Sequence, residues 1–250
     1  MQFTEFLNQY LTEFTPFRQF DISHLVAVMV MLLFCTLLPY FAKKHLTITH
    51  QHLLGTILGA FVLANFIFWY LLLISSGTFI LKNDLPLQAC HFANIFLLMV
   101  MWRKNESWFR IFYFWILAGT MQAIITPDIQ ANFPHYWYWR YWIVHAGPVV
   151  CIVYAAYVYE FRPRASSILK SFLAINLMLL FIGILNYYLN SNYAFLNSKP
   201  AVKSLFNYLG PWPWYLLVAD LAAFILFAVV YLPYWFMDLR KKKITIKTIN

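Results

Sequence analysis

Seven long apolar stretches constrain what this chain can fold into more than any other feature of its sequence. A helix that crosses a bilayer needs about 20 mainly apolar residues. Stretches that match or approach this length cover residues 23–42, 53–74, 86–102, 108–126, 137–159, 169–189 and 213–237, and the third is the shortest. The sequence therefore predicts an all-α integral membrane protein that forms a single seven-helix membrane domain over residues 1–250.

The composition supports this class of protein. The chain is 62% hydrophobic and 11% charged, whereas soluble domains carry about 25% charged residues. No interval between the stretches is long enough for a soluble domain. The first 22 residues contain Glu5, Glu13 and Asp21 and lack the basic region of a cleaved signal peptide, so we do not expect one. We expect a multi-pass membrane protein.

The basic residues predict the orientation. Of the 18 Lys and Arg residues, 13 follow the first, third and fifth stretches or lie at the C-terminus: Lys43, Lys44, Arg103, Lys104, Arg110, Arg162, Arg164, Lys170, Arg240, Lys241, Lys242, Lys243 and Lys247. The other face holds Arg18, Lys82, Arg140, Lys199 and Lys203. By the positive-inside rule, the C-terminus is cytoplasmic and the N-terminus is outside. This distribution accounts for the net charge of +9 without nucleic-acid binding, which we exclude.

The potentially reactive side chains gather in the outer half of the predicted bilayer. They are Cys90, His91, Gln122, Asp128, His145 and Asp220. An ionisable residue inside the membrane is costly, by at least about 2.5 kcal/mol for Asp at mid-depth, and therefore favours a functional interpretation. Structural interpretations remain open: a hydrogen bond between helices for Asp220, a histidine satisfied within the bundle for His145, and a small packing residue for Cys90.

Cys90 is the candidate nucleophile of this cluster. A thiolate needs a nearby base or a lowered pKa. Asp84 is expected to cap the third helix, with Pro86 in its first turn, which would put Cys90 close to a helix N-terminus that stabilises an anion. His145 is the expected base, because His91 is the next residue on the helix and points about 100° away from Cys90.

The remaining polar residues suit supporting roles. Asp220 or Asp128 could orient His145, and Gln122 or a backbone N–H could stabilise an oxyanion. A phosphate headgroup could bind at the outer face, although the same residues are typical of any membrane interface: Pro134, His135, Arg140, Lys199 and Lys203. Aromatic runs that include Trp214 and Tyr215 fit an interfacial belt and would equally suit a lipid pocket.

Other side chains leave alternatives open. Cys35 and Cys151 have no polar residues near them in the sequence, and we expect them to be structural, with no disulfide, metal site or cofactor. Four asparagines could line a transport route or form interhelical hydrogen bonds: Asn65, Asn94, Asn176 and Asn186. The interrupted helices in matching halves that are typical of transporters are not evident.

Several motifs occur in order along the chain: LPLQAC (85–90), YFWILAGTMQAIITPD (113–128), RYWIVHAG (140–147), YEFRPR (159–164), NYAFLNSKPAVKSLFNYLGPWPWY (192–215) and YLP (231–233). In these motifs the chain resembles the YwaF-type bacterial integral membrane family and its eukaryotic relative, transmembrane protein 164. The resemblance implies seven helices in a bacterial cell membrane. From the eukaryotic branch it implies transfer of a fatty acyl chain from a phospholipid to a lysophospholipid through a cysteine thioester.

The resemblance also implies roles for individual residues. Cys90 closes the LPL-x-x-C motif, His145 is the histidine of the fifth-helix motif, and Gln122 and Asp128 belong to the QA-x-x-TPD motif. The family often has His where this chain has Gln88. It also often has Ser-His-Gly where this chain has Val-His-Ala at residues 144–146.

Two main hypotheses follow. In the first, the protein is an acyltransferase in which Cys90 and His145 are catalytic and membrane phospholipids are the partners. A pocket beside them would be formed by His91, Gln88, Tyr215, Trp214 and Arg140. In the second, a non-enzymatic protein binds or transports a small solute or lipid through the same pocket. A structural role in an envelope complex is a third option, and the oligomeric state stays open.

Overall fold

The computed structural model describes residue 6 and residues 9–11, 13–200 and 205–249. Within these residues the regular structure is helical, apart from one isolated antiparallel β-bridge between Pro16 and Ala131. Six helical units in the described part are long and apolar enough to cross a membrane: α2 (Ile22–His45), α3 (Ile48–Ser75), the unit Glu106–Ile125, α8 (Tyr136–Val158), α9 (Ala165–Leu189) and Trp214–Arg240 within α10 (Trp214–Ile249).

The third predicted stretch forms a shorter helix than expected. α5 (Ala89–Met101) has 13 residues, or about 20 Å at 1.5 Å per residue, whereas a bilayer core is about 30 Å thick. The one-turn helix α4 (Leu81–Asp84) precedes it. The predicted cap is wrong: Asp84 ends α4, where its Oδ2 accepts the N–H of Ile80 at 2.7 Å, and Gln88 occupies the N-cap position of α5.

The fourth stretch is helical throughout but changes its winding halfway. It consists of α6 (Glu106–Phe114), the π-helix η1 (Trp115–Thr120) and α7 (Met121–Ile125). π-helical turns are rare and often occur at functional sites. η1 packs against α5, α8 and α10, so the altered winding lies inside the bundle.

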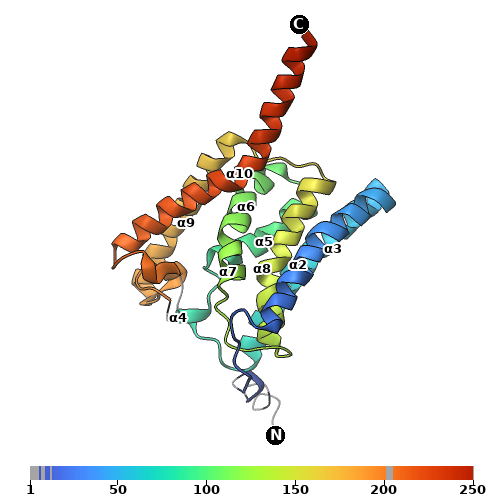
Figure 1. Cartoon of the computed structure of the whole chain (residues 1–250). Coiled ribbons are helices and arrows are strands. Elements are labelled where there is room, and N and C mark those ends of the chain that lie inside the picture. Colours follow the sequence, from blue (N-terminus) through green and yellow to red (C-terminus); the bar gives the residue numbers. More distant parts are fainter. Residues whose placement is uncertain (1–5, 7–8, 12, 201–204, 250) are drawn as a thin grey trace.

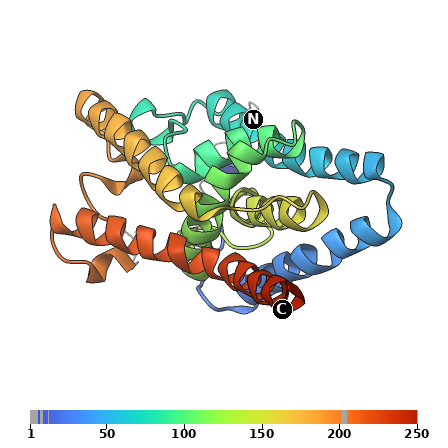
Figure 2. The same cartoon turned by 90° about the horizontal axis from the view of Figure 1, so that it is seen from above.

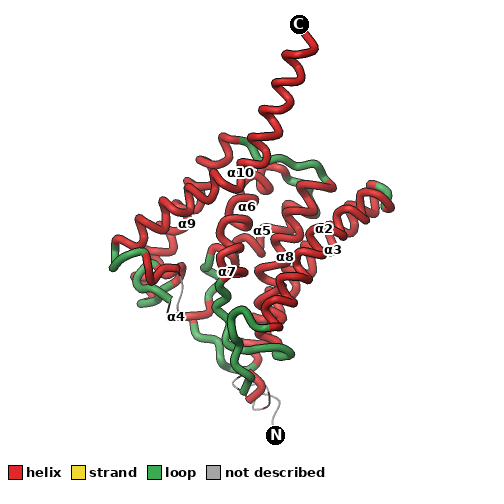
Figure 3. The backbone as a smooth tube through the Cα atoms, in the orientation of Figure 1, coloured by secondary structure: helices red, strands yellow, loops and turns green. Residues whose placement is uncertain are grey.

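α8 lies at the centre of the molecule. It packs against α2, α3, α5, α7 and η1. α2 and α3 lie on one side of this centre and α9 and α10 lie on the other (Figure 1, Figure 2). The connecting loops, with the short helices η2 (Tyr193–Phe195) and η3 (Leu205–Tyr208), gather at the ends of the bundle (Figure 3).

Local sequence signals explain several helix ends. Asp21, Thr47 and Asn105 are N-cap residues whose side chains accept backbone N–H bonds of α2, α3 and α6. Asn190 adopts the left-handed conformation, with φ of 48°, directly after α9. Basic residues in the last turn of α2 complement the partial negative charge of the helix C-terminus. These ends agree with the predicted boundaries to within a few residues.

Burial differs strongly between the helices. The buried core is built mainly from α8 and the Glu106–Ile125 unit, whereas α2, α9 and α10 expose most of their apolar side chains. A soluble protein rarely exposes such large apolar surfaces. The fold is therefore that of a multi-pass membrane protein whose central helices are shielded from lipid by the outer ones.

Candidate active site at the junction of α5 and α8

Cys90 is the second residue of α5 and lies in its first turn. The first four N–H groups of a helix have no partner within the helix and carry partial positive charge. The N–H groups of Cys90 and His91 interact with the Cys90 thiol. The short α5 thus brings the sulfur closer to the helix terminus than the sequence predicts.

Asn94 ties this first turn to the central helix. Its side chain is buried, and its Nδ2 donates to the carbonyl of Cys90 at 2.6 Å and to that of Val144 at 3.1 Å. Val144 directly precedes His145. One amide group therefore links the residue that carries the thiol to the turn that carries the imidazole.

The hydrogen bond of His145 determines which of its nitrogens can act as a base. Nδ1 lies 2.8 Å from the carbonyl oxygen of Tyr141. Because a carbonyl only accepts, Nδ1 carries the proton and donates it, which leaves the lone pair of the neutral ring on Nε2. The Tyr141 ring packs against the imidazole, with ring centroids 4.2 Å apart, and its hydroxyl donates to the carbonyl of Ala123 at 2.8 Å.

Arg140 supplies a positive charge beside these groups. Its guanidinium lies over the ring of Trp69, 4.5 Å from the centroid, and acts electrostatically on Cys90, His91 and His145. Arg140 has no ion-pair partner among the described residues. A cation inside an apolar bundle is costly without a counter-charge, so this arrangement favours an anionic ligand.

Six buried side-chain polar atoms on the helices around Cys90 and His145 have no hydrogen-bond partner in the described part of the chain. They belong to α3, α5 and α8, and they are Asn65 Oδ1, His91 Nδ1, Asn94 Oδ1, Trp137 Nε1, Arg140 Nε and Trp142 Nε1. Nearly all buried polar groups in folded proteins have a partner. α3, α5 and α8 pack against one another, and we call the part of their interface that carries these atoms the polar chamber, since the atoms are available to water or to the polar part of a ligand.

His91 faces α3 rather than α8. Its ring lies 5.2 Å from that of Phe66 and 6.5 Å from that of Tyr70, measured between centroids. His145, in turn, acts electrostatically on His91. His91 therefore lies on the α3 side of the polar chamber.

Gln88 contacts a loop rather than Cys90. Its Oε1 accepts the N–H of Ala194 at 3.0 Å. The hydroxyl of Tyr193 accepts the N–H of Leu85 at 2.8 Å and donates to the carbonyl of Leu81 at 2.7 Å. The motif around residues 192–199 thus holds the segment that leads into α5, and Gln88 positions the first turn of α5.

Tyr215 supports the same loop from α10. The buried hydroxyl of Tyr215 donates to the carbonyl of Phe195, and the ammonium of Lys199 lies 5.6 Å from the Tyr215 ring centroid. Trp214 is 62% exposed. Lys203 lies outside the described residues.

Asp220 has a hydrogen bond to a neighbouring helix. Its Oδ1 accepts from Asn176 Nδ2 at 3.0 Å, which joins α10 to α9. This is the bond that the structural interpretation of Asp220 requires. Among the hydrogen bonds of the described residues, none joins Asp220 to His145, so an orienting role for Asp220 has no support in this geometry.

Asp128 and Gln122 lie at the end of α7. The backbone N–H of Asp128 donates to the Tyr141 hydroxyl at 3.2 Å, and partial burial raises the pKa of the Asp128 carboxyl. The Gln122 carbonyl accepts from the N–H and hydroxyl of Thr126. Among the described residues, no hydrogen bond joins the Gln122 side chain to Cys90 or His145. The contact of Asp128 with Tyr141 is made by its backbone, and no hydrogen bond joins the Asp128 carboxylate to His145 among the described residues.

The N-terminal segment covers the end of the bundle next to this site, a role that the sequence did not reveal. The N–H of Phe17 donates to the carbonyl of Gln130 at 2.7 Å, and Tyr10 accepts from His135 Nε2 at 2.7 Å. The other nitrogen of His135 accepts the N–H of Trp137. With both nitrogens engaged, His135 is a structural cap and is not available for a headgroup. Pro134 beside it is exposed.

These features define a multi-pass helical membrane protein with a polar chamber inside an apolar bundle. The model of the TMEM164 family matches residues 19–231, and the chain belongs to this family. The match includes every residue of the predicted site. Comparisons with curated proteins and with solved structures gave no significant match.

Proposed function

We propose that the protein is a thiol-dependent acyltransferase, which moves a fatty acyl chain from a phospholipid to a lysophospholipid through a thioester at Cys90. The single observation that carries this proposal is the position of Cys90. It lies in the first turn of α5, is tied to the His145 turn through Asn94, and is next to Arg140, which has no counter-charge among the described residues. Family membership and the motif resemblance to YwaF-type bacterial proteins support the same class.

In the first half of the reaction, Nε2 of His145 takes the proton of the Cys90 thiol. The thiolate then attacks the ester carbonyl of the donor phospholipid. When the tetrahedral intermediate collapses, the carbon–oxygen ester bond breaks, a thioester forms at Cys90, and the histidine returns its proton to the leaving lysophospholipid hydroxyl. A backbone N–H group in the first turn of α5, or the Gln122 amide, would stabilise the oxyanion.

In the second half, the same histidine activates the acceptor. Nε2 takes the proton of an acceptor lysophospholipid hydroxyl as its oxygen attacks the thioester. The sulfur leaves as a thiolate and recovers the proton from His145, so that the enzyme returns to its starting state. Tyr141 keeps His145 in the required tautomer, which is a positioning role.

Arg140 is the proposed partner of the donor phosphate. A guanidinium offers several N–H donors to phosphate oxygens, and Nε of Arg140 is buried without a hydrogen-bond partner. Cation–π contact with Trp69 fixes its plane. A phosphodiester bound here would neutralise the charge that the protein leaves uncompensated.

The proposed membrane is that of a bacterial cell, with seven passes, the N-terminus outside and the C-terminus cytoplasmic. α5 would complete the third pass together with the segment before it. The start of α2 and the end of α10 lie at opposite ends of the bundle in Figure 1, as an odd number of passes requires. The chamber then faces the outer leaflet.

The test uses purified protein in nanodiscs with a phosphatidylcholine donor and a fluorescent lysophosphatidylcholine acceptor. We expect transfer, and an intact mass increased by one acyl group that hydroxylamine removes. Cys90→Ser should abolish both the transfer and the adduct, whereas the control Cys35→Ser should retain them. Transfer that persists in Cys90→Ser would reject the proposal. It would favour the binding or transport protein, in which Arg140 matters and the thiol does not.

A further inference from the structure

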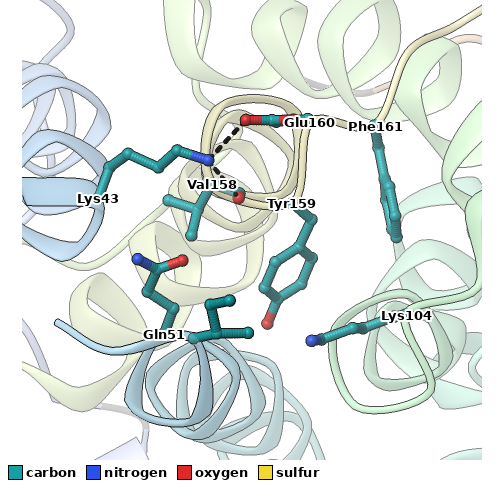
Figure 4. Close-up of a pocket in the computed structure, with 8 residues that line it drawn as sticks. Lys43, Gln51, Lys104, Val158, Tyr159, Glu160 and Phe161 are labelled. Atoms are coloured by element: carbon teal, nitrogen blue, oxygen red, sulfur yellow. Dashed lines mark hydrogen bonds and ion pairs between the residues drawn. The ribbon is translucent and has the colours of Figure 1, made fainter.

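A small cavity at the opposite end of the bundle brings together three segments that are distant in the sequence. It has a volume of about 240 Å³ and is lined by Lys43, Ile48, Gln51, Lys104 and residues 158–161 (Figure 4). A water molecule in the liquid takes about 30 Å³. The cavity therefore has room for a small ionic group together with some water.

One wall of the cavity carries a lysine with a weak partner. Lys43 Nζ lies 2.7 Å from Glu160 Oε1 and donates to the carbonyl of Val158 at 3.3 Å. The hydrogen bond and charge of Lys43 lower the pKa of Glu160, so this carboxylate is ionised at neutral pH. Because an exposed ion pair contributes little, a stronger anion can displace Glu160 from Lys43.

The opposite wall carries a lysine without a counter-charge. The ammonium of Lys104 lies 5.3 Å from the Tyr159 ring centroid and has no ion pair or hydrogen bond among the described residues. Nearby carboxylates are already paired: Glu106 with Arg110, at 2.6 Å, and Asp238 with Arg162, at 2.9 Å. The two lysines approach the same space from two sides in Figure 4.

We propose that this cavity binds a phosphate group between the ammonium groups of Lys43 and Lys104. Its source is either the headgroup of an anionic phospholipid or free inorganic phosphate. Basic pockets between helices on the cytoplasmic side of a membrane commonly hold phosphorylated headgroups. The cavity lies at the other end of α8 from Cys90, so this site is independent of the proposed acyl transfer.

Replacement of Glu160 should strengthen binding, unlike replacement of the lysines. The Glu160 carboxylate pairs with Lys43 and repels a bound phosphate, so Glu160→Gln should tighten the binding of phosphate. Lys43→Gln and Lys104→Gln should each weaken binding by about fivefold, as expected for loss of one lysine contact with an anionic headgroup. Lys44→Gln is the matched control, because Lys44 is next to Lys43, contacts Tyr40 and does not line the cavity.

The experiment measures binding to the full chain in detergent by titration calorimetry. The probes are inorganic phosphate, dioctanoyl phosphatidic acid and, as a zwitterionic reference, dioctanoyl phosphatidylcholine. Tighter binding of phosphatidic acid than of inorganic phosphate would identify a headgroup site, and equal binding would identify a site for free phosphate. The absence of binding, an equal loss in Lys44→Gln, or no gain in Glu160→Gln would each overturn the proposal. Size-exclusion profiles of the variants check that they fold.

Discussion

At the scale of single residues, the site depends on which hydrogen-bonding positions are occupied and which are left open. The carbonyl of Tyr141 occupies Nδ1 of His145, so the base nitrogen is determined by the backbone of α8. Asn94 uses its amide protons to join α5 and α8 and leaves its oxygen without a partner in the chamber. Structural bonds therefore fix the geometry, and the unpaired atoms remain for a ligand.

The first prediction concerns the imidazole. His145→Gln keeps a side chain that can donate a hydrogen bond to the Tyr141 carbonyl but removes the titratable base. We expect acyl transfer to fall about 10²–10⁴-fold, the usual contribution of a general base. The assay is the transfer of acyl groups in nanodiscs. The control His50→Gln changes an exposed histidine at the start of α3 and should retain the wild-type rate. A wild-type rate in His145→Gln would rule out its role as the base.

At the scale of elements, helix α8 holds the molecule together because it contacts both the outer helix pair α2 and α3 and the inner helices. Its approach to α3 is close at Gly147. A Cβ atom at this position would lie 2.7 Å from Val62 Cγ2, which is shorter than any normal carbon–carbon contact. The absence of a side chain at Gly147 therefore sets the spacing of the two helices next to His145.

The second prediction follows from this spacing. Gly147→Ala should destabilise the protein, because overpacking of a well-packed interior costs about 1–3 kcal/mol, or a fall in Tm of roughly 2–12 °C. Gly183→Ala in α9 is the matched control, since its new Cβ would meet Leu196 at an ordinary 3.7 Å. We expect no loss there, because Ala favours a helix more than Gly does. Thermal unfolding in detergent measures both. Equal Tm values would show that α3 and α8 are not closely packed here.

At the scale of the whole molecule, charge divides the two ends of the bundle. The end that holds the start of α3 and the ends of α2 and α8 carries most of the basic residues, whereas α4, which leads into α5, lies at the other end in Figure 1. Such an asymmetry is the signal that orients helices during insertion. The two proposed sites would then face opposite sides of the membrane.

The third prediction tests this orientation. In a background without native cysteines, a cysteine replacing the exposed Asn83 should react with a membrane-impermeant maleimide on intact cells. One replacing the exposed Lys170, at the start of α9, should react only after the cells are permeabilised. The reverse pattern would invert the topology, and labelling of both positions on intact cells would contradict the odd number of passes that separates Asn83 from Lys170.

The sequence was sufficient to predict the class of fold but not the details that build the site. Hydropathy and length predicted the helices, because apolar residues leave no alternative in a membrane. The predicted start of the third helix at residue 86 was wrong. Asp84 and Gln88 are both polar residues that could cap this helix, and the hydrogen bond between Gln88 and Ala194 favours Gln88 as its N-cap. The π-helical winding of residues 115–120 depends on packing, for which the local sequence gives no periodic signal.

Of the predicted site residues, those on the packed helices α5 and α8 lie near one another: Cys90, His91, Arg140 and His145 interact electrostatically. Asp220 bonds to Asn176 instead, and the sequence offered two interpretations for it without a way to choose. Asn94, which lies one turn after Cys90 on the same face of α5, could have been recognised as the link from that spacing alone.

The most buried span of this protein is not its most hydrophobic one, and this has a consequence for how the chain is made. α8 has a mean hydropathy of 1.6, against 2.4 for α2 and α3, so a nascent α8 enters lipid less readily by itself. By the time α8 leaves the ribosome, α2 and α3 have already entered the membrane, and these are its most extensive neighbours. The order of synthesis therefore places α2 and α3 in the membrane before α8 is made, so α8 can pack against them as it enters. A circular permutant that started at α8 would lose this advantage.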